Sequence, residues 1–215
     1  MKNKVLQDAF KWLFIGLLLC FGVSYVTSSS EEIFMAVFGI FNGLGIFIYL
    51  IAELVLAIVL AVRITKMSPS TAKALYLVYA ALTGLSLTGV FLVYTASSIA
   101  LVFLATSIIF GVFAIIGKNS NIDLTKFGLY LFAALIAIII VTIINIFIGS
   151  DSLTMLLCIV GILVFAGYTA YDVQYALQKT DMLGENAGIY CAFQLFLDFI
   201  NLFIKLLRLF GKRDD

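Results

Sequence analysis

Seven long apolar runs separated by short polar loops divide the 215 residues of this chain. A helix that crosses the hydrocarbon core of a bilayer needs about 20 mostly apolar residues. The runs cover approximately residues 12–28, 33–62, 74–95, 98–116, 127–148, 153–172 and 187–210. Backbone groups in lipid must be hydrogen-bonded within the protein, so open runs of this kind are expected to be helices. The sequence therefore predicts an all-α integral membrane protein, a seven-helix bundle forming a single transmembrane domain over residues 1–215.

Composition supports the membrane class and excludes several others. Hydrophobic residues make up 64% of the chain and charged residues 12%, against about 45–50% and 25% in soluble domains. A net charge of +1 gives no basic footprint for nucleic acid. The chain has no His, which excludes Ser–His triads and HExxH zinc sites. We predict neither an enzyme nor a bound cofactor, and interpret the three isolated cysteines as buried apolar residues.

The first two runs differ from the others in their flanks and length. Charged residues precede the run at 12–28, but no small-residue cleavage site closes it, so it is expected to be a retained span rather than a signal peptide. A single helix over 33–62 would be about 45 Å long, against a hydrocarbon core of about 30 Å. Asn42-Gly43-Leu44-Gly45 predicts a break in it, with the membrane portion mainly at 46–62.

The distribution of Lys and Arg predicts the orientation of the spans. Nine basic residues lie in the N-terminal tail and in the second, fourth and sixth loops: Lys2, Lys4, Lys11, Arg63, Lys66, Lys73, Lys118, Lys126 and Lys179. The first, third and fifth loops carry no Lys or Arg. The N-terminus is therefore expected to be cytoplasmic. The seventh segment leaves two alternatives, because its basic tail lies outside if the segment crosses fully and inside if it is re-entrant.

Three acidic residues lie within the apolar runs, where an ionisable side chain is costly and suggests function. They are Glu53, Asp172 and Asp198, and Arg63 at the end of the second run is a basic candidate to meet them. Each of the first two has a structural alternative. Glu53 could be a carboxyl hydrogen-bonded to a neighbouring helix, and Asp172 could be a boundary carboxylate solvated at the cytoplasmic interface.

The last run carries its polar residues on one stripe. Gln194, Asp198, Asn201, Lys205 and Arg208 follow a spacing of 4, 3, 4, 3, which places them on one face of a helix. Either this helix lies in the interface with its stripe among the headgroups, or it is central and its stripe lines a cavity. The position of Asp198 near the middle of the stripe favours the second alternative.

Five segments together resemble one membrane protein family. They are Gly167–Asp172, Leu195–Phe203, Leu206–Gly211 and the loops Arg63–Ser68 and Asn121–Thr125. They are similar to the transmembrane Bax inhibitor motif family, also called the Bax inhibitor-1 or YccA-like family. The resemblance implies two three-helix layers around a central C-terminal helix. It also implies that Asp172 and Asp198 face each other, that Arg63 matches a latch-like arginine and that Glu53 matches an intramembrane glutamate.

The same resemblance implies a pH-sensitive calcium leak, and suppression of cell death by eukaryotic members. Two carboxylates at hydrogen-bond distance in a low-dielectric site cannot both ionise cheaply, so such a pair shares a proton. We expect the Asp172–Asp198 pair to be the pH sensor and a weak, transient Ca²⁺ site, supported by Asn201 and Gln194. The expected partners are the lipid bilayer, Ca²⁺ and protons, in a bacterial cell membrane, with no nucleic acid.

Two alternatives from other classes remain. The chain could be a non-conducting membrane regulator of a protease or of a stress or cell-death partner complex. An intramembrane aspartyl protease would also set two aspartates on adjacent helices. Residues 195–197 are Leu-Phe-Leu rather than the Gly-x-Gly that precedes the second aspartate of those enzymes, and the single proline, Pro69, lies in a loop.

Overall fold

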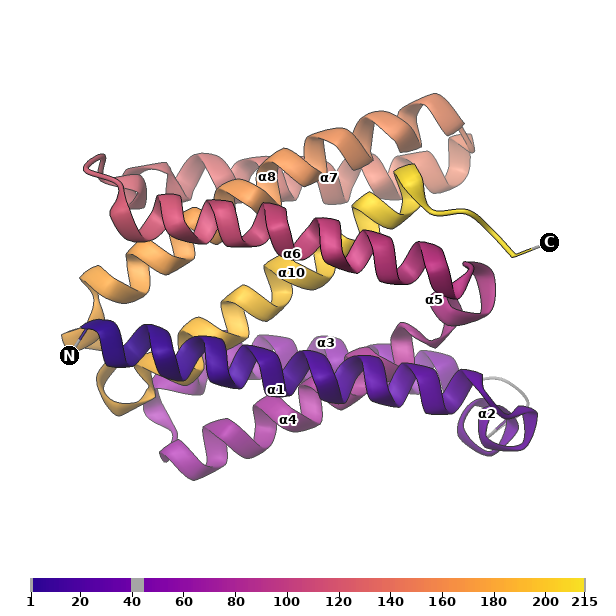
Figure 1. Ribbon diagram of the computed structural model, residues 1–215, viewed down its shortest axis with the longest axis horizontal. Helices are drawn as coiled ribbons and strands as arrows, with labels where there is room; N and C mark the ends of the chain where they lie inside the picture. The colour runs from indigo at the N-terminus through magenta and orange to yellow at the C-terminus, as the bar shows by residue number, and fades with distance from the viewer. Residues whose placement is uncertain (1, 40–44, 215) are drawn as a thin grey trace. The chain divides into compact units, whose positions relative to one another are not determined.

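The computed structural model describes residues 2–39 and 45–214, and this part of the chain is predominantly helical (Figure 1). The α-helices are α1 (Lys2–Ser28), α2 (Glu31–Phe38), α3 (Gly45–Arg63), α4 (Pro69–Ser86), α5 (Thr88–Val93), α6 (Ala96–Asn119), α7 (Gly128–Ile148), α8 (Asp151–Gln178), α9 (Thr180–Leu183) and α10 (Ala187–Phe210). Short 3-10 turns cover Ile64–Lys66, Leu124–Phe127 and Gly184–Asn186. No β-strand is present in the described ranges.

Seven helical segments are long and apolar enough to cross a membrane, which confirms the predicted all-α membrane class. They are Asn3–Ser28, Ile46–Lys66, Pro69–Val93, Ala96–Asn119, Leu124–Ile148, Asp151–Gln178 and Thr180–Phe210. The third span is formed by α4 and α5, which meet at Leu87. The long run at 33–62 is divided into α2 and α3, as its excess length requires. The predicted break at 42–45 lies largely outside the described residues, since these resume at Gly45.

Local capping chemistry fixes where several spans begin and end. The hydroxyls of Ser68, Thr95 and Ser150 accept hydrogen bonds from backbone N–H groups in the first turns of α4, α6 and α8. Pro69, the single proline, occupies the first turn of α4, where its missing N–H costs nothing. Gly149 ends α7 with a φ of 69°, a left-handed conformation that glycine adopts without strain.

The chain divides into two compact units. Unit 1 comprises residues 1–94, 180–193 and 213–215. Within it, α4 packs against both α1 and α3. Gly84 permits the closest approach, because a Cβ there would overlap the backbone oxygen of Cys20 on α1. The hydroxyl of Ser24 then reaches across to donate to the Gly84 carbonyl at 2.7 Å. Small residues at helix contacts are the usual means of close packing in membranes.

Unit 2 comprises residues 95–179 and 194–212. Here α8 packs against α6 and α7. Gly117 of α6 lies directly against the backbone of Ala170 on α8, so no side chain separates the two helices at that point. On another face of α8, Gly161 lies against the alkyl stem of Lys205 from α10.

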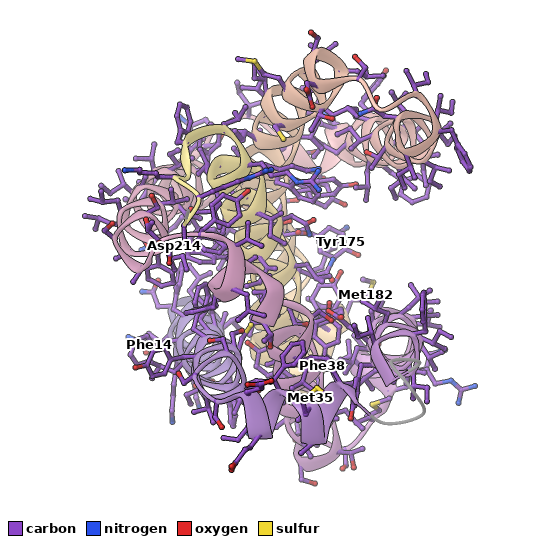
Figure 2. All side chains as sticks on the ribbon, turned by 90° about the vertical axis from the view of Figure 1, so that its right-hand side faces the viewer. Phe14, Met35, Phe38, Tyr175, Met182 and Asp214 are labelled. Carbon is purple, nitrogen blue, oxygen red and sulfur yellow. The ribbon has the colours of Figure 1, made fainter. Side chains whose placement is uncertain are left out.

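Burial differs widely among the spans. Large apolar side chains are exposed along the outer helix faces, including Phe14 of α1, which is labelled in Figure 2. Within an 18-residue stretch of each span, 6% of the residues are buried in Ile46–Lys66 and 72% in Thr180–Phe210, the highest share of the seven. Such burial is expected of a central C-terminal helix. The arrangement of two three-helix layers around it stays a prediction.

The residues after α10 pair with the segment that precedes α6. In unit 2, Thr95 N donates to Lys212 O at 3.0 Å and Lys212 N donates to Ser98 Oγ at 2.9 Å. The C-terminal end of α10 therefore lies beside the start of α6. Both alternatives for the seventh segment, full crossing and re-entry, stay predictions.

Candidate membrane carboxylate site

Two buried carboxylates meet between α8 and α10 within unit 2. Asp172 lies in the last two turns of α8 and is 3% exposed, and Asp198 lies in the middle of α10 and is 4% exposed. Their side chains are within hydrogen-bonding reach of each other. The structure thus brings together the two aspartates that the sequence singled out. It does not place Asp172 at a solvated boundary, because α8 continues past the apolar run to Gln178.

The groups around this pair are few. Gln194, one turn before Asp198 on α10, is placed to donate a hydrogen bond to the Asp172 carboxylate. Tyr168, one turn before Asp172, lies close to both carboxylates. The Oδ2 atom of Asp198 is buried and accepts no hydrogen bond from any described residue. Since ionised carboxylates are acceptors only, two facing carboxylates require a shared proton or a cation between them.

The other residues of the polar stripe on α10 differ in their burial. Gln194, Asn201 and Lys205 are half-buried, and Arg208 is exposed. Asn201 uses its side-chain amide within its own helix, where Nδ2 donates to Leu197 O at 2.8 Å. The stripe is therefore less buried than the apolar faces of the helix, with Asp198 as its most buried member.

Glu53 forms a different kind of site in unit 1. From α3 it accepts a hydrogen bond from Thr83 Oγ1 at 2.8 Å and a short one from Ser86 Oγ, both on α4. This is the arrangement given above as the structural alternative for Glu53, a carboxyl bonded to a neighbouring helix. The two hydroxyl residues were missed in the sequence. Their spacing of three in an apolar span was the signal that could have found them.

Arg63 is the last residue of α3 and is exposed. Within the described part of the chain it forms no ion pair. It belongs to unit 1 with Glu53, whereas Asp172, Asp198, Gln194 and Asn201 belong to unit 2. A latch between Arg63 and the aspartate pair therefore stays a prediction.

Gln174 is a site residue that sequence reasoning did not identify. It is buried on α8, and its Oε1 accepts from Leu124 N at 2.6 Å while its Nε2 donates to Ile122 O at 2.9 Å. These bonds hold the loop between α6 and α7 against α8, within one turn of Asp172. An isolated glutamine in a helix gives no sequence signal for such a long-range contact.

Asp123 is the acidic residue of that same loop, outside the spans. Its Oδ1 accepts from the Thr125 hydroxyl at 2.6 Å and from Thr125 N at 3.2 Å. Lys126 Nζ lies 3.9 Å from its Oδ2. The Thr125 hydroxyl first, and the lysine to a lesser degree, stabilise the ionised form, so the pKa of Asp123 is lowered.

A dedicated metal centre is not apparent among the described residues. No group of three or more Cys, Asp or Glu side chains that could hold a metal ion occurs there. The Asp172–Asp198 pair offers two carboxylates, fewer than the six to eight oxygen ligands that Ca²⁺ takes. A cation at this pair would need oxygens from Asn201, the backbone or water, which is the composition of a weak site.

A family model described as "Inhibitor of apoptosis-promoting Bax1" matches residues 2–215. The chain belongs to the Bax inhibitor family. The resemblance seen in the sequence is thereby confirmed over nearly the whole chain. Together with the seven apolar helices, membership in the Bax inhibitor family makes the chain a multi-pass membrane protein.

Individual bacterial relatives align over most of their length. The chain is 37% identical over 219 residues to the inner membrane protein YbhL of Escherichia coli strain K12, covering 97% of this chain and 91% of YbhL. It is 36% identical to a protein of Borreliella burgdorferi, covering 99% and 93%. A membrane protein of Streptococcus pyogenes serotype M3 is 34% identical over 168 residues, covering 76% and 73%. The family fold and these relatives are consistent with a bacterial membrane location.

Proposed function

We propose that this Bax inhibitor family protein is a pH-sensitive Ca²⁺ leak channel gated by the Asp172–Asp198 pair. The observation that supports the proposal is the contact of two buried carboxylates on two membrane helices, with no hydrogen-bond donor for Asp198 Oδ2 among the described residues. An intramembrane ionisable pair is expected to serve transport of protons or ions.

The pair has two states with different chemistry. When it holds one proton, a short hydrogen bond joins α8 and α10 and neutralises half of the negative charge. When both carboxylates are ionised they repel each other and attract a divalent cation. Ca²⁺ coordinated by Asp172, Asp198, the Asn201 side-chain oxygen and water would be weakly held, which lets the ion leave again.

The supporting residues have distinct parts in this proposal. Gln194 donates to Asp172 and orients its carboxylate toward Asp198. Arg63 is the competing cation, a latch that closes the path when it pairs with the ionised carboxylates. With the N-terminus cytoplasmic, the pair lies toward the cytoplasmic half of the spans, because α8 ends on the side of the sixth loop.

The test is Ca²⁺ flux into dye-loaded liposomes between about pH 5 and 8 for the wild type, Asp172→Asn and Asp198→Asn. A one-proton gate changes the flux by up to about tenfold per pH unit. We expect a pH midpoint in the wild type and a flat response in each variant. Glu53→Gln is the matched control, since it neutralises a membrane carboxylate outside the pair.

Two results would contradict the proposal. Wild-type Ca²⁺ flux equal to that of empty liposomes at every pH would show that the protein is not a Ca²⁺ channel. The alternative of a non-conducting regulator of a membrane partner would then take its place, tested by co-purification from native membranes. A pH-dependent flux that persists in both Asn variants would show that the aspartate pair is not the pH sensor, although the protein still conducts Ca²⁺.

A further inference from the structure

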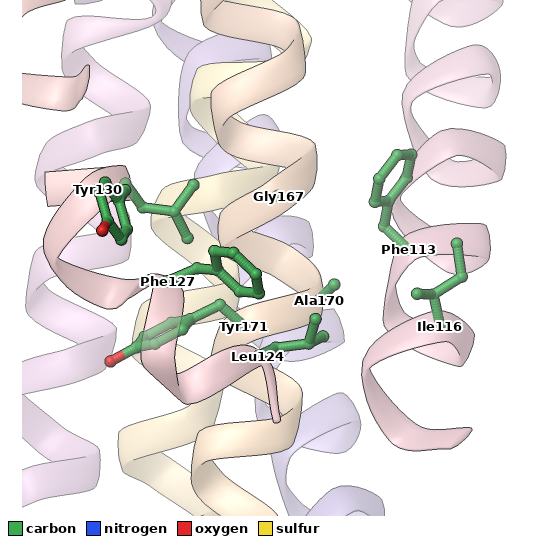
Figure 3. A pocket seen from close by; sticks show the side chains of 9 residues that line it. Phe113, Ile116, Leu124, Phe127, Tyr130, Gly167, Ala170 and Tyr171 are labelled. Atoms are coloured by element: carbon green, nitrogen blue, oxygen red, sulfur yellow. The ribbon is translucent and has the colours of Figure 1, made fainter. Parts of the chain in front are cut away.

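A cavity of about 370 Å³ lies inside unit 2, on the side of α8 that faces α6 and α7. Figure 3 shows Phe113 and Ile116 of α6 across from Phe127, Tyr130 and Tyr171. Its volume lies within the range of small-molecule sites in proteins. Its walls are almost wholly apolar. The Asp172–Asp198 pair is not among its lining residues.

The cavity lies at one end of the membrane-spanning segments. Phe113 and Ile116 belong to the last turns of α6, and Phe127 immediately precedes α7. Phe127 and Tyr130 are largely exposed, as aromatic residues are at the level where acyl chains meet headgroups. A cavity with apolar walls at this depth is reached most directly by molecules of the bilayer itself.

The structure around the cavity is firmly held. Gly117 brings α6 against the backbone of Ala170, and Gly128 brings the start of α7 against the Tyr171 ring. Gln174 bonds the 120–124 loop to α8 at the polar end. These contacts fix three walls relative to one another. The cavity is therefore bounded by helices that are packed directly against one another within unit 2.

Two exposed lysines adjoin lining residues in sequence: Lys118 follows Ile116 by two residues, and Lys126 directly precedes Phe127. Lys118 lies in the last turn of α6, Lys126 in the 3-10 turn that lines the cavity, and Lys179 caps α8, and all three are exposed. The one carboxylate of the adjoining loop, Asp123, already accepts hydrogen bonds from Thr125. Lys126 also lies 3.9 Å from Asp123, so the two lysines beside the lining residues, Lys118 and Lys126, leave an excess of one positive charge that favours an anionic headgroup. Basic pockets between spans on the cytoplasmic side are known to bind such headgroups.

We propose that this cavity binds an anionic phospholipid of the surrounding bilayer, with one acyl chain among Phe113, Phe127 and Tyr171 and the phosphate beside Lys118 and Lys126. The apolar walls select a hydrocarbon chain, and the lysines select the charge of the headgroup. Such a lipid would contact α8 at Gly167, Ala170 and Tyr171, the last of which directly precedes Asp172, while the aspartate pair itself does not line the cavity. The proposal does not depend on the leak function.

The experiment uses tryptophan fluorescence in vesicles. Trp12, the single tryptophan, is replaced by Phe, and Phe127→Trp supplies a reporter at the cavity rim. Quenching is compared for phosphatidylglycerol and phosphatidylcholine carrying brominated acyl chains. Leu129→Trp is the matched control, because Leu129 lies at the same level, is 75% exposed and does not line the cavity.

We expect phosphatidylglycerol to quench Phe127→Trp at a much lower mole fraction than phosphatidylcholine. Each lysine near a membrane surface contributes roughly fivefold to the affinity for anionic lipid. Lys118→Gln and Lys126→Gln are therefore each expected to weaken the preference by about that factor. Lys66→Gln, in the loop before α4, is expected to leave it unchanged. Leu129→Trp is expected to show no preference.

Three outcomes would overturn the proposal. Equal quenching of Phe127→Trp by the two lipids would show that no anionic lipid is selected. An equal preference at Leu129→Trp would show a general lipid annulus rather than a site. Finally, Gly167→Leu fills the cavity against the flexible Leu131 side chain, so unchanged quenching in that folded variant would place the acyl chain elsewhere. Circular dichroism of each variant confirms that it is folded.

Discussion

Each unit of the molecule holds a carboxylate site within the membrane spans, and the two sites are built differently. In unit 1, Glu53 accepts hydrogen bonds from two hydroxyl groups of the neighbouring helix. In unit 2, Asp172 and Asp198 face each other, and one carboxylate oxygen of Asp198 has no donor in the part of the chain that the structure describes. The first site is satisfied by the protein itself. The second is the site that the proposed function assigns to a shared proton or a cation.

We expect this difference to separate an acid with a structural role from an acid with a functional one. Hydroxyl donors stabilise a buried carboxyl whether it is charged or neutral, since a hydroxyl can donate or accept. A second carboxylate cannot donate unless it carries a proton. Under the proposed function, the occupancy of the unit 2 site depends on pH or on cation concentration, and the unit 1 site has no such requirement. Four predictions test this distinction.

The largest expected effect is on the shared proton. Infrared spectra of the wild type between about pH 5 and 8 are expected to contain a titrating band from a protonated carboxyl. Asp172→Asn and Asp198→Asn are each expected to abolish that titration, because an amide donates without taking up a proton. Glu53→Gln is expected to leave it intact. Loss of the band in Glu53→Gln instead would reverse the roles assigned to the two sites.

A second prediction compares close helix contacts in the two units. A methyl group at Gly117 would overlap the Ala170 carbonyl, and one at Gly84 would overlap the Cys20 carbonyl. We expect each alanine variant to lower the free energy of unfolding by about 1–3 kcal/mol, measured in mixed micelles. Because α8 carries Asp172, Gly117→Ala is also expected to shift the pH midpoint of flux, and Gly84→Ala is not.

Gly111→Ala is the control for these variants. A methyl group there meets no atom within 4 Å, and alanine is the better helix former. An equal loss of stability in all three variants would show that glycine content, and not close helix approach, is what matters.

A third prediction concerns the bond between α3 and α4. Glu53→Leu leaves the Thr83 and Ser86 hydroxyls without their acceptor, and we expect it to lower the free energy of unfolding by about 1–2 kcal/mol. A double-mutant cycle with Thr83→Val is expected to give a coupling energy of about 0.5–1.5 kcal/mol. A coupling energy of zero would mean that Glu53 does not rely on Thr83.

The smallest effect is expected in the loop between α6 and α7. The pKa of Asp123 is lowered from 3.8, so its ionised form stabilises the folded loop above the unfolded pKa. That contribution is lost as the pH falls through the lowered value. Hydrogen exchange of residues 120–127 is expected to quicken at acid pH in the wild type and to depend less on pH in Asp123→Asn. The same pH dependence in both would assign it to another group.

The number and class of the helices could be predicted because hydropathy and the hydrogen-bonding needs of backbone in lipid act locally along the chain. The end of α8 could not be predicted from the sequence. Its apolar run stops near Asp172, while the helix continues to Gln178 because Gln174 finds partners in a loop about fifty residues earlier. Local composition carries no signal for such a bond.

Only part of the candidate site could likewise be predicted from the sequence. The heptad spacing on the last helix identified Asp198 and Gln194 from the sequence alone. Glu53 was identified as an anomaly, but its partners Thr83 and Ser86 depend on how α3 packs against α4. The cavity beside Tyr171 depends on three helices and a loop at once, and on glycines whose role emerges only from their neighbours.

The burial of the three cysteines has a practical consequence for kinetic measurements. Cys20, Cys158 and Cys191 lie on α1, α8 and α10 and are each at most 2% exposed. A thiol reagent reaches such a group only when its helix opens. The labelling rate of each cysteine, followed by mass spectrometry, therefore measures how often its own helix opens. An introduced surface cysteine can carry a probe while the native three remain protected.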